Sequence, residues 1–390
     1  MDKRRVITIF LIALALAALV YFQFQHWKQF DWEQFAAQTA GINWWAILGA
    51  IGLIYATYVL RAVRWAIFLR PVCRVRSDKL IPATFIGFTG LALLGRPGEF
   101  IRPYLIAKET GLTVSSQAGV WAVERIFDIG AFTLLLTADI FISRELHGFP
   151  YYSQFRKAGF ALIAVVILLA FGAFMMKRRG AGISAWLERR LRLISPNFAR
   201  HAASKARAFG EGLNTIHDLS SFLQLVGVSL AIWWLIALGY RTVAHAYPLL
   251  PHVAGERALH HLDVPEVLLL MGLSMVGSLV QLPAVGGGSQ LAVISGLQGI
   301  YNVRPELAVS CGVMLWLVTF MTCIPVGLFF AHRGHLSLRR LSAESHAEEE
   351  REEDEAEPLF AGANPHPAPK PPEKADESDR PSRGRQEPSS

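Results

Sequence analysis

A short run of charged and helix-breaking residues, Gly95–Arg102, interrupts a long apolar segment of the chain. The run includes Arg96, Gly98, Glu99 and Arg102. Arginine binds phosphate and carboxylate groups in bidentate geometry, so these residue types suit an anion-binding site. Charged side chains and broken backbone persist at membrane depth only where they pair, face water or lie buried in protein. The run is therefore a polar site within a membrane or a short loop outside it, and we favour the first interpretation.

Two further arginines, Arg61 and Arg64, lie near the end of another apolar segment. They are three residues apart and so share one face of a helix. Long basic side chains at a helix end can extend their charge to the membrane surface. The same two guanidinium groups could instead contact a phosphate. Both interpretations are open from the sequence.

A third charged group, formed by Glu124, Arg125 and Asp128, lies inside an apolar segment that is expected to be a helix. Glu124 and Asp128 are four residues apart and face the same way, whereas Arg125 is displaced around the helix. Unpaired charges here and in the first run would be too costly within a membrane. We therefore expect the two segments to lie together, with Glu99 or Glu124 paired to Arg102 or Arg125.

A second break, at Gln281–Gln290, resembles the first in kind, because a proline is followed by glycines and then by a polar residue. Free N–H groups at helix ends beside such a break can bind an anion. We expect the amides of Gln281 and Gln290 and the backbone around Gly287 to form one polar cavity with the first run. A lipid headgroup would enter this cavity sideways while its tails stay in the bilayer.

The composition indicates an all-α integral membrane protein. The chain has 390 residues, of which 52% are hydrophobic and 18% are charged, against about 25% charged in soluble domains. The net charge of +7 is concentrated in loops, where basic residues set membrane orientation, so it does not indicate a nucleic-acid partner. The three cysteines and the histidines of the Pro248–Asp263 loop have no metal-ligand spacing, so we expect solvated histidines, no metal and no cofactor.

Apolar runs of about 20 residues can cross a bilayer, and two longer stretches are broken in the middle. We expect about six full spans plus two re-entrant helical hairpins, because the two halves of each broken stretch are too short to cross separately. The expected spans are Val6–Phe24, Trp45–Leu69, Gln117–Ile142, Ala158–Met176, Phe222–Tyr247 and Leu307–Phe330, and the hairpins are Leu80–Lys108 and Val264–Ile300.

Loop charges give the expected orientation. The strongly basic loop Lys177–Ser220 and both termini are placed in the cytoplasm of a cell (inner) membrane, and Pro248–Asp263 is placed outside. The first hairpin then opens to the cytoplasm and the second to the outside, which is the pattern of an inverted repeat with a site where the breaks meet. The alternative is that Val264–Leu282 crosses fully. Residues 1–332 form the membrane domain, and residues 333–390, acidic and then proline-rich, form a disordered tail.

Three motifs together resemble the lysylphosphatidylglycerol synthase transmembrane region, a flippase-like family: Arg61-Ala-Val-Arg-Trp65, Gly95-Arg-Pro-Gly-Glu-Phe-Ile-Arg102 and Val123-Glu-Arg-Ile-Phe-Asp128. Pro283–Gln290 is similar to the family's second-half motif, although Gln290 stands where the family usually carries a glutamate. The resemblance implies a domain that moves a lipid between leaflets. A separate synthase domain has no counterpart here, so the resemblance favours a transporter over an enzyme and suggests a lipid-modifying partner enzyme.

Three classes of function fit these features. The first is a translocator of a phospholipid or polyprenyl-linked lipid, which binds an anionic headgroup through arginines. The second is a membrane-embedded lipid-modifying enzyme, for which no nucleophile–base pair stands out. The third is a structural or regulatory protein whose charges only hold helices together. The sequence does not name the lipid, the direction of movement, the driving force or the oligomeric state.

Overall fold

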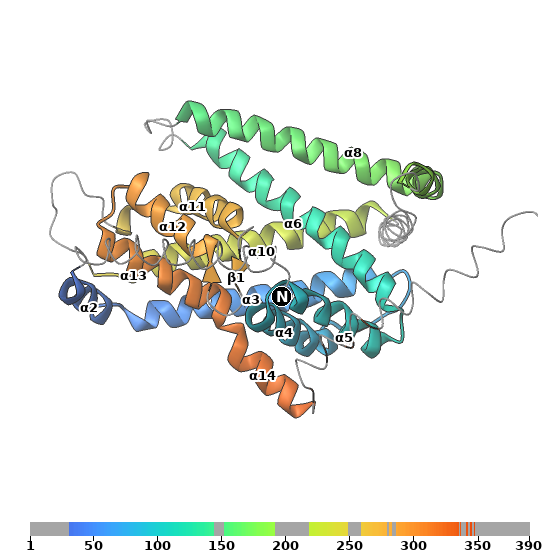
Figure 1. Cartoon of the computed structure of the whole chain (residues 1–390), viewed down its shortest axis with the longest axis horizontal. Helices are drawn as coiled ribbons and strands as arrows, with labels where there is room; N and C mark the ends of the chain where they lie inside the picture. The colour runs from blue at the N-terminus through green and yellow to red at the C-terminus, as the bar shows by residue number, and fades with distance from the viewer. Residues whose placement is uncertain are drawn as a thin grey trace, which may run out of the picture.

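The computed structural model describes residues 31–143, 152–191, 218–248, 259–278, 281–282 and 286–334, together with residues 336, 341, 344 and 347. The described part is almost entirely helical (Figure 1). The expected first span, Val6–Phe24, lies outside the described residues, as does most of the C-terminal tail.

Within the described residues, three helical segments are long and apolar enough to cross a membrane. They are α3 (Trp44–Leu69), α10 (Leu219–His245) and Pro305–Arg333, which consists of α13 (Pro305–Trp316), a π-helical turn (Leu317–Met321) and α14 (Cys323–Arg333). A short helix, α2 (Trp32–Ala40), precedes α3 and packs on α13. These segments correspond to three of the six expected spans.

Two other helices cover the remaining expected spans within the described residues. Helix α6 (Val114–Ile142) has 29 residues and carries the third charged group. Helix α8 (Tyr152–Leu191) has 40 residues, bends at Arg179 and packs on α6 (Figure 1). The non-helical backbone at Arg179 divides α8 into two helices, of which the first ends close to the expected end at Met176 and the second lies in the basic loop.

Both expected breaks separate pairs of helices that pack against each other. The first pair is α4 (Ser77–Leu94) and α5 (Ile101–Thr110), joined by the 3-10 turn Arg96–Phe100. The second pair is α11 (Val264–Gly277) and α12 (Gly288–Gly299), between which the two-residue strands β1 (Gln281–Leu282) and β2 (Gly286–Gly287) pair antiparallel. Helix α11 has 14 residues, about 21 Å, which is short of the ~30 Å bilayer core.

A close contact between two glycines occurs at each break. A Cβ on Gly98 would collide with the carbonyl group of Gly90, and a Cβ on Gly277 would collide with the carbonyl group of Gly288. Each pair brings the backbone on the two sides of the break into contact. The two hairpins therefore share a packing requirement that the sequence motifs alone did not reveal.

The long helices bring the two halves of the chain together. Helices α3 and α10 have the most extensive contact in the described structure. Each hairpin also touches the helix that follows the other hairpin, because α4 packs on α14 and α11 packs on α6. One core cluster lies along α3, α10 and the second hairpin, and another surrounds Trp65, Ile101 and Val123.

Two local contacts bear on the expectations of solvated histidines and of a disordered tail. His260 is partly buried, and its Nε2 lies 2.5 Å from the carbonyl oxygen of Tyr247, so the expectation of a solvated histidine is wrong there. Leu341 is 2% exposed and belongs to the core cluster around Trp65, and Tyr104 Oη donates to Glu344 3.1 Å away. Packing therefore continues past residue 333, whereas disorder of the tail stays a prediction.

Candidate functional site

Helix α3 contributes two buried arginines. Arg64 is fully buried, and its guanidinium group donates to Glu124 at 2.6 Å, to Asp128 at 2.7 Å and to Ser229 at 2.9 Å. Arg61 is 8% exposed, and its Nη1 lies 3.5 Å from Asp128 Oδ2. Both side chains therefore point into the protein, and the interpretation that they extend to the membrane surface is wrong.

Helix α6 contributes two carboxylates, each of which three arginines contact. Glu124 accepts from Arg64, Arg102 and Arg125. Asp128 lies one turn further on, within 2.7 Å of Arg64, 3.1 Å of Arg125 and 3.5 Å of Arg61. The displaced Arg125 thus reaches both carboxylates, while 40% of its side chain stays exposed.

The first hairpin contributes Arg102, near the start of α5. Its guanidinium group forms an ion pair with Glu124 through both carboxylate oxygens. It also lies 4.3 Å from the ring centre of Trp65 and 5.2 Å from that of Phe88, a cation–π arrangement. A Cβ on Gly87 of α4 would collide with the Arg102 side chain, so the glycine leaves the space that this arginine occupies.

The expected meeting of the two charged segments is therefore confirmed for Arg102, Arg125 and Glu124. We call the six charged residues the arginine cluster: Arg61, Arg64, Arg102, Glu124, Arg125 and Asp128.

Two supporting residues were not anticipated from the sequence. Ser229 of α10 accepts from Arg64 and so brings the second half of the chain to the cluster. Gln117 accepts from Trp65 Nε1 at 2.9 Å and fixes the indole ring on which Arg102 lies. A serine in an apolar helix gives no signal of its partner, because its hydroxyl can bond its own helix backbone.

Positive charge and hydrogen-bond donors are both in excess in the arginine cluster. Four arginines face two carboxylates, which leaves two positive charges unmatched within the cluster. Each guanidinium group carries five N–H donors and no acceptor, and the buried Nε atoms of Arg64 and Arg125 have no hydrogen-bond partner among the described residues. The cluster can therefore accept an anion that has several acceptor oxygens.

Other candidates from the first run have different surroundings. The Arg96 side chain is outside what the structure describes. Glu99 is half-buried and, among the described residues, forms no ion pair with Arg102 or Arg125. Gly98 lies where the two arms of the hairpin touch, which gives it a packing role.

The candidates at the second break are not joined to the cluster by the described contacts. Gln281 pairs through its backbone with Gly287, and its side chain is not described. Gln290 Oε1 accepts from Gly287 N at 3.4 Å and so caps α12. Gly287 has a φ of 120°, a conformation that favours glycine. Among the described residues, no hydrogen bond or ion pair links Gly287 or Gln290 to the arginines.

A family model described as "Lysylphosphatidylglycerol synthase TM region" matches residues 7–327. The chain belongs to this family. The match covers most of the chain and includes every residue of the arginine cluster and both hairpins, so the expected family is confirmed. Family membership and the membrane-length helices together identify the chain as a multi-pass helical membrane protein.

Comparisons with curated proteins and with solved structures gave no match. Within the described part of this family domain, no group of three His, Cys, Asp or Glu side chains could hold a metal ion.

Proposed function

We propose that this protein moves a lipid with an anionic headgroup between membrane leaflets, and that the arginine cluster binds the phosphate of that headgroup. The observation that carries the proposal is the surplus of two positive charges in a cluster of which most side chains are buried. The family membership supports the membrane setting.

A buried surplus of charge favours an anionic ligand for a physical reason. Charges that leave water lose hydration, and mutual attraction restores part of that loss only where opposite charges balance. The two carboxylates cannot balance four arginines, whereas a phosphate with up to two negative charges can. Arg61 and Arg102 are the natural contacts, because both lie beside Phe88 at 5.1 and 5.2 Å and each retains a small exposed fraction.

The same charge balance ranks the candidate lipids. An anionic phospholipid or polyprenyl-linked lipid brings the missing negative charge. An aminoacylated lipid adds a cationic group, for which both carboxylates of the cluster are already occupied by arginines. We therefore place an anionic lipid first. A lipid-modifying enzyme remains a weaker candidate, because carboxylates held by guanidinium groups are poor proton acceptors.

We infer that the two halves form an inverted repeat, which gives the site a route to both leaflets. The reciprocal packing of α4 on α14 and of α11 on α6 supports this inference, as do the glycine contacts at the two breaks. Transporters built this way alternate access around a site near the midplane. The loop charges favour an orientation with both termini in the cytoplasm, and we propose the cell membrane as the location.

The test is lipid movement in vesicles that contain the purified full chain. The panel is phosphatidic acid, phosphatidylglycerol, an aminoacylated phospholipid and a polyprenyl phosphate, each with a leaflet-specific probe. We expect the anionic lipids to cross faster than in empty vesicles. Loss of one charged hydrogen bond in Arg102→Gln removes about 1.5–3 kcal/mol, so phosphate affinity should fall roughly ten- to hundredfold.

The control is Arg189→Gln, because Arg189 is exposed on α8 and bonds only its own helix among the described residues. It should leave lipid movement unchanged at matched protein amounts. If no lipid of the panel crosses faster than in empty vesicles, the translocator proposal fails. If a lipid crosses and Arg102→Gln behaves as wild type, the arginine cluster is not the headgroup site.

A further inference from the structure

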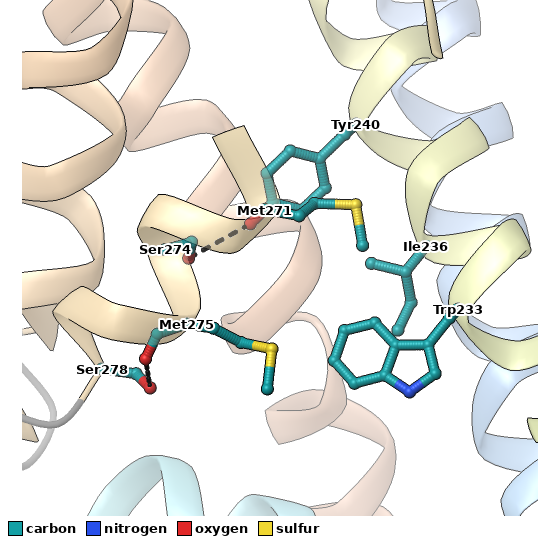
Figure 2. A pocket seen from close by; sticks show the side chains of 7 residues that line it. All are labelled: Trp233, Ile236, Tyr240, Met271, Ser274, Met275 and Ser278. Atoms are coloured by element: carbon teal, nitrogen blue, oxygen red, sulfur yellow. Dashed lines mark hydrogen bonds between the residues drawn. The ribbon is translucent and has the colours of Figure 1, made fainter. Parts of the chain in front are cut away.

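A second feature, distinct from the arginine cluster, is a cavity between α10 and α11 in the other half of the chain. Its volume is about 150 Å³. Figure 2 shows its lining: from α10 Trp233, Ile236 and Tyr240, and from α11 Met271, Ser274, Met275 and Ser278. We call it the α10–α11 pocket.

The α10–α11 pocket is apolar despite its hydroxyl groups. Tyr240 Oη lies 3.4 Å from Ser274 Oγ, and Ser278 Oγ donates to the carbonyl oxygen of Met275 at 2.7 Å (Figure 2). The hydroxyls are thus satisfied within the protein. An occupant meets two thioethers, an aliphatic side chain and aromatic rings. The buried Nε1 of Trp233 has no hydrogen-bond partner among the described residues, and the rest of this surface suits hydrocarbon. Methionine adapts its shape readily to an irregular apolar group.

Two helices connect this pocket to the arginine cluster. On α10, Trp233 lies four residues after Ser229, which bonds Arg64. On α6, Phe132 lies four residues after Asp128, and its ring centre is 4.9 Å from that of Trp233. Four residues correspond to a rise of about 6 Å along a helix. The apolar pocket therefore begins about one helical turn from the charged groups, along both helices.

The outer side of the same helices faces away from the protein. Trp234 is 43% exposed and Val276 is 69% exposed, and each is the sequence neighbour of a residue that lines the pocket. In a membrane protein, large apolar side chains exposed on helices face lipid. Hydrocarbon chains of the bilayer are therefore adjacent to the pocket.

We propose that the α10–α11 pocket takes a segment of the hydrocarbon chain of the same lipid whose phosphate binds the arginine cluster. This inference rests on the proposed function and extends it, because it assigns the chain of the lipid a place on the second half of the protein. A dry cavity of about 150 Å³ can hold a benzene-sized apolar group, so the pocket fits a short segment and leaves the rest of the chain in the bilayer.

The experiment is photo-crosslinking of the full chain in phosphatidylcholine nanodiscs. The probe is a trace of phosphatidic acid with a diazirine in one acyl chain, and the comparison probe is phosphatidylcholine with the same labelled chain. We expect the phosphatidic acid probe to label Trp233, Met271 or Met275, as mapped by mass spectrometry, at least several-fold more than the comparison probe does.

Matched substitutions separate pocket binding from general lipid contact. Met275→Trp fills the pocket and should reduce this labelling at least several-fold, whereas Val276→Trp, on the next and exposed residue, should leave it unchanged. Met275→Phe is the milder variant if Met275→Trp is poorly produced. Arg61→Gln should also reduce pocket labelling, because the headgroup no longer holds the chain in place.

Three results would overturn the inference: labelling confined to outward residues such as Val276, equal pocket labelling by both probes, or pocket labelling that survives Arg61→Gln. These failures are distinguishable from failure of the proposed function. A protein that moves anionic lipids in vesicles with normal dependence on Arg102 but shows no pocket labelling would retain the proposed function and lose only this inference.

Discussion

The arginine cluster lies on α3, α5 and α6 in the first half of the chain, whereas the α10–α11 pocket lies in the second half, and the two have opposite chemistry. In the first half, a long helix, a hairpin and the next helix bring together four arginines and two carboxylates. In the second half, a long helix and a hairpin enclose methionine and aromatic side chains. On our proposal, this difference in chemistry lets the two regions bind the two ends of one amphipathic ligand.

The two halves also differ in how much each depends on its polar contacts. In the first half, each carboxylate is shared by three arginines, so one substitution disturbs a network of coupled and mostly buried charges. In the second half, the Tyr240–Ser274 contact is 3.4 Å long and most of the lining is apolar. We therefore expect substitutions in the arginine cluster to have larger effects on stability than substitutions in the pocket.

The largest effect is expected for Arg64→Gln. Arg64 is fully buried and contacts both carboxylates and Ser229. Arg64→Gln disrupts the hydrogen bonds to both carboxylates and to Ser229, and hydrogen bonds to charged groups contribute about 1.5–3 kcal/mol each. The amount of protein in the membrane and its melting temperature should therefore fall sharply. The control is Arg76→Gln, since Arg76 pairs with Asp78 on the surface. Equal abundance of the two variants would contradict the view that Arg64 organises the cluster.

A smaller loss of stability is expected from substitutions at both breaks, and its size should be similar in the two halves of the chain. In Gly98→Ala and Gly277→Ala, the new Cβ collides with a backbone carbonyl group across the hairpin. Overpacking of this kind typically costs about 1–3 kcal/mol. Thermal unfolding in detergent measures this loss of stability. Gly52→Ala is the control, because a Cβ at that position would have nothing within 4 Å of it. If the substitution lowers stability in one hairpin alone, the two breaks are not equivalent.

Met275→Trp should change lipid movement more than stability. Met275 is only partly buried and lines the pocket, so the indole can displace the lipid segment without displacing the core. We expect slower movement of phosphatidic acid in vesicles and a melting temperature close to that of Val276→Trp. Movement as fast as in wild type would separate the pocket from the transport cycle.

The smallest effect is expected for removal of residues 348–390. This segment is acidic and proline-rich and has too little apolar surface to offset its ordering entropy. Abundance and membrane insertion should stay unchanged, as quantified by immunoblotting of membrane fractions. A truncation that also removes Leu341 should lower abundance, because Leu341 is buried in the core cluster around Trp65. A large drop from the shorter truncation would contradict this boundary.

Several features of the fold and site followed from the sequence because they depend on local chemistry. Proline and glycine within apolar segments predicted the breaks at Gly95–Arg102 and Gln281–Gln290. The cost of unpaired charge in a membrane predicted that Arg102 and Glu124 would meet. The resemblance carried by the charged motifs predicted the family.

Other features depend on packing between distant segments, which one sequence does not display. Arg61 and Arg64 lie near a helix end, a position that also suits side chains that extend to the membrane surface. Only the packing of α6 and α5 over that face of α3 shows that they are buried. Ser229 joins the cluster only because α10 packs along α3. The α10–α11 pocket likewise arises from the way two helices fit together, and neither helix signals it alone.

The most direct test of the central claim is the rate of phosphatidic acid movement by Arg61→Gln in vesicles. Among the described residues, the one ion pair of Arg61 is its 3.5 Å contact with Asp128. Asp128 keeps Arg64 and Arg125 when Arg61 is removed, so the variant should fold in normal amounts. We predict that Arg61→Gln moves phosphatidic acid at least tenfold more slowly than the wild-type protein does, with an unchanged melting temperature. Wild-type movement by a normally folded Arg61→Gln protein would contradict the claim that the surplus positive charge binds the headgroup.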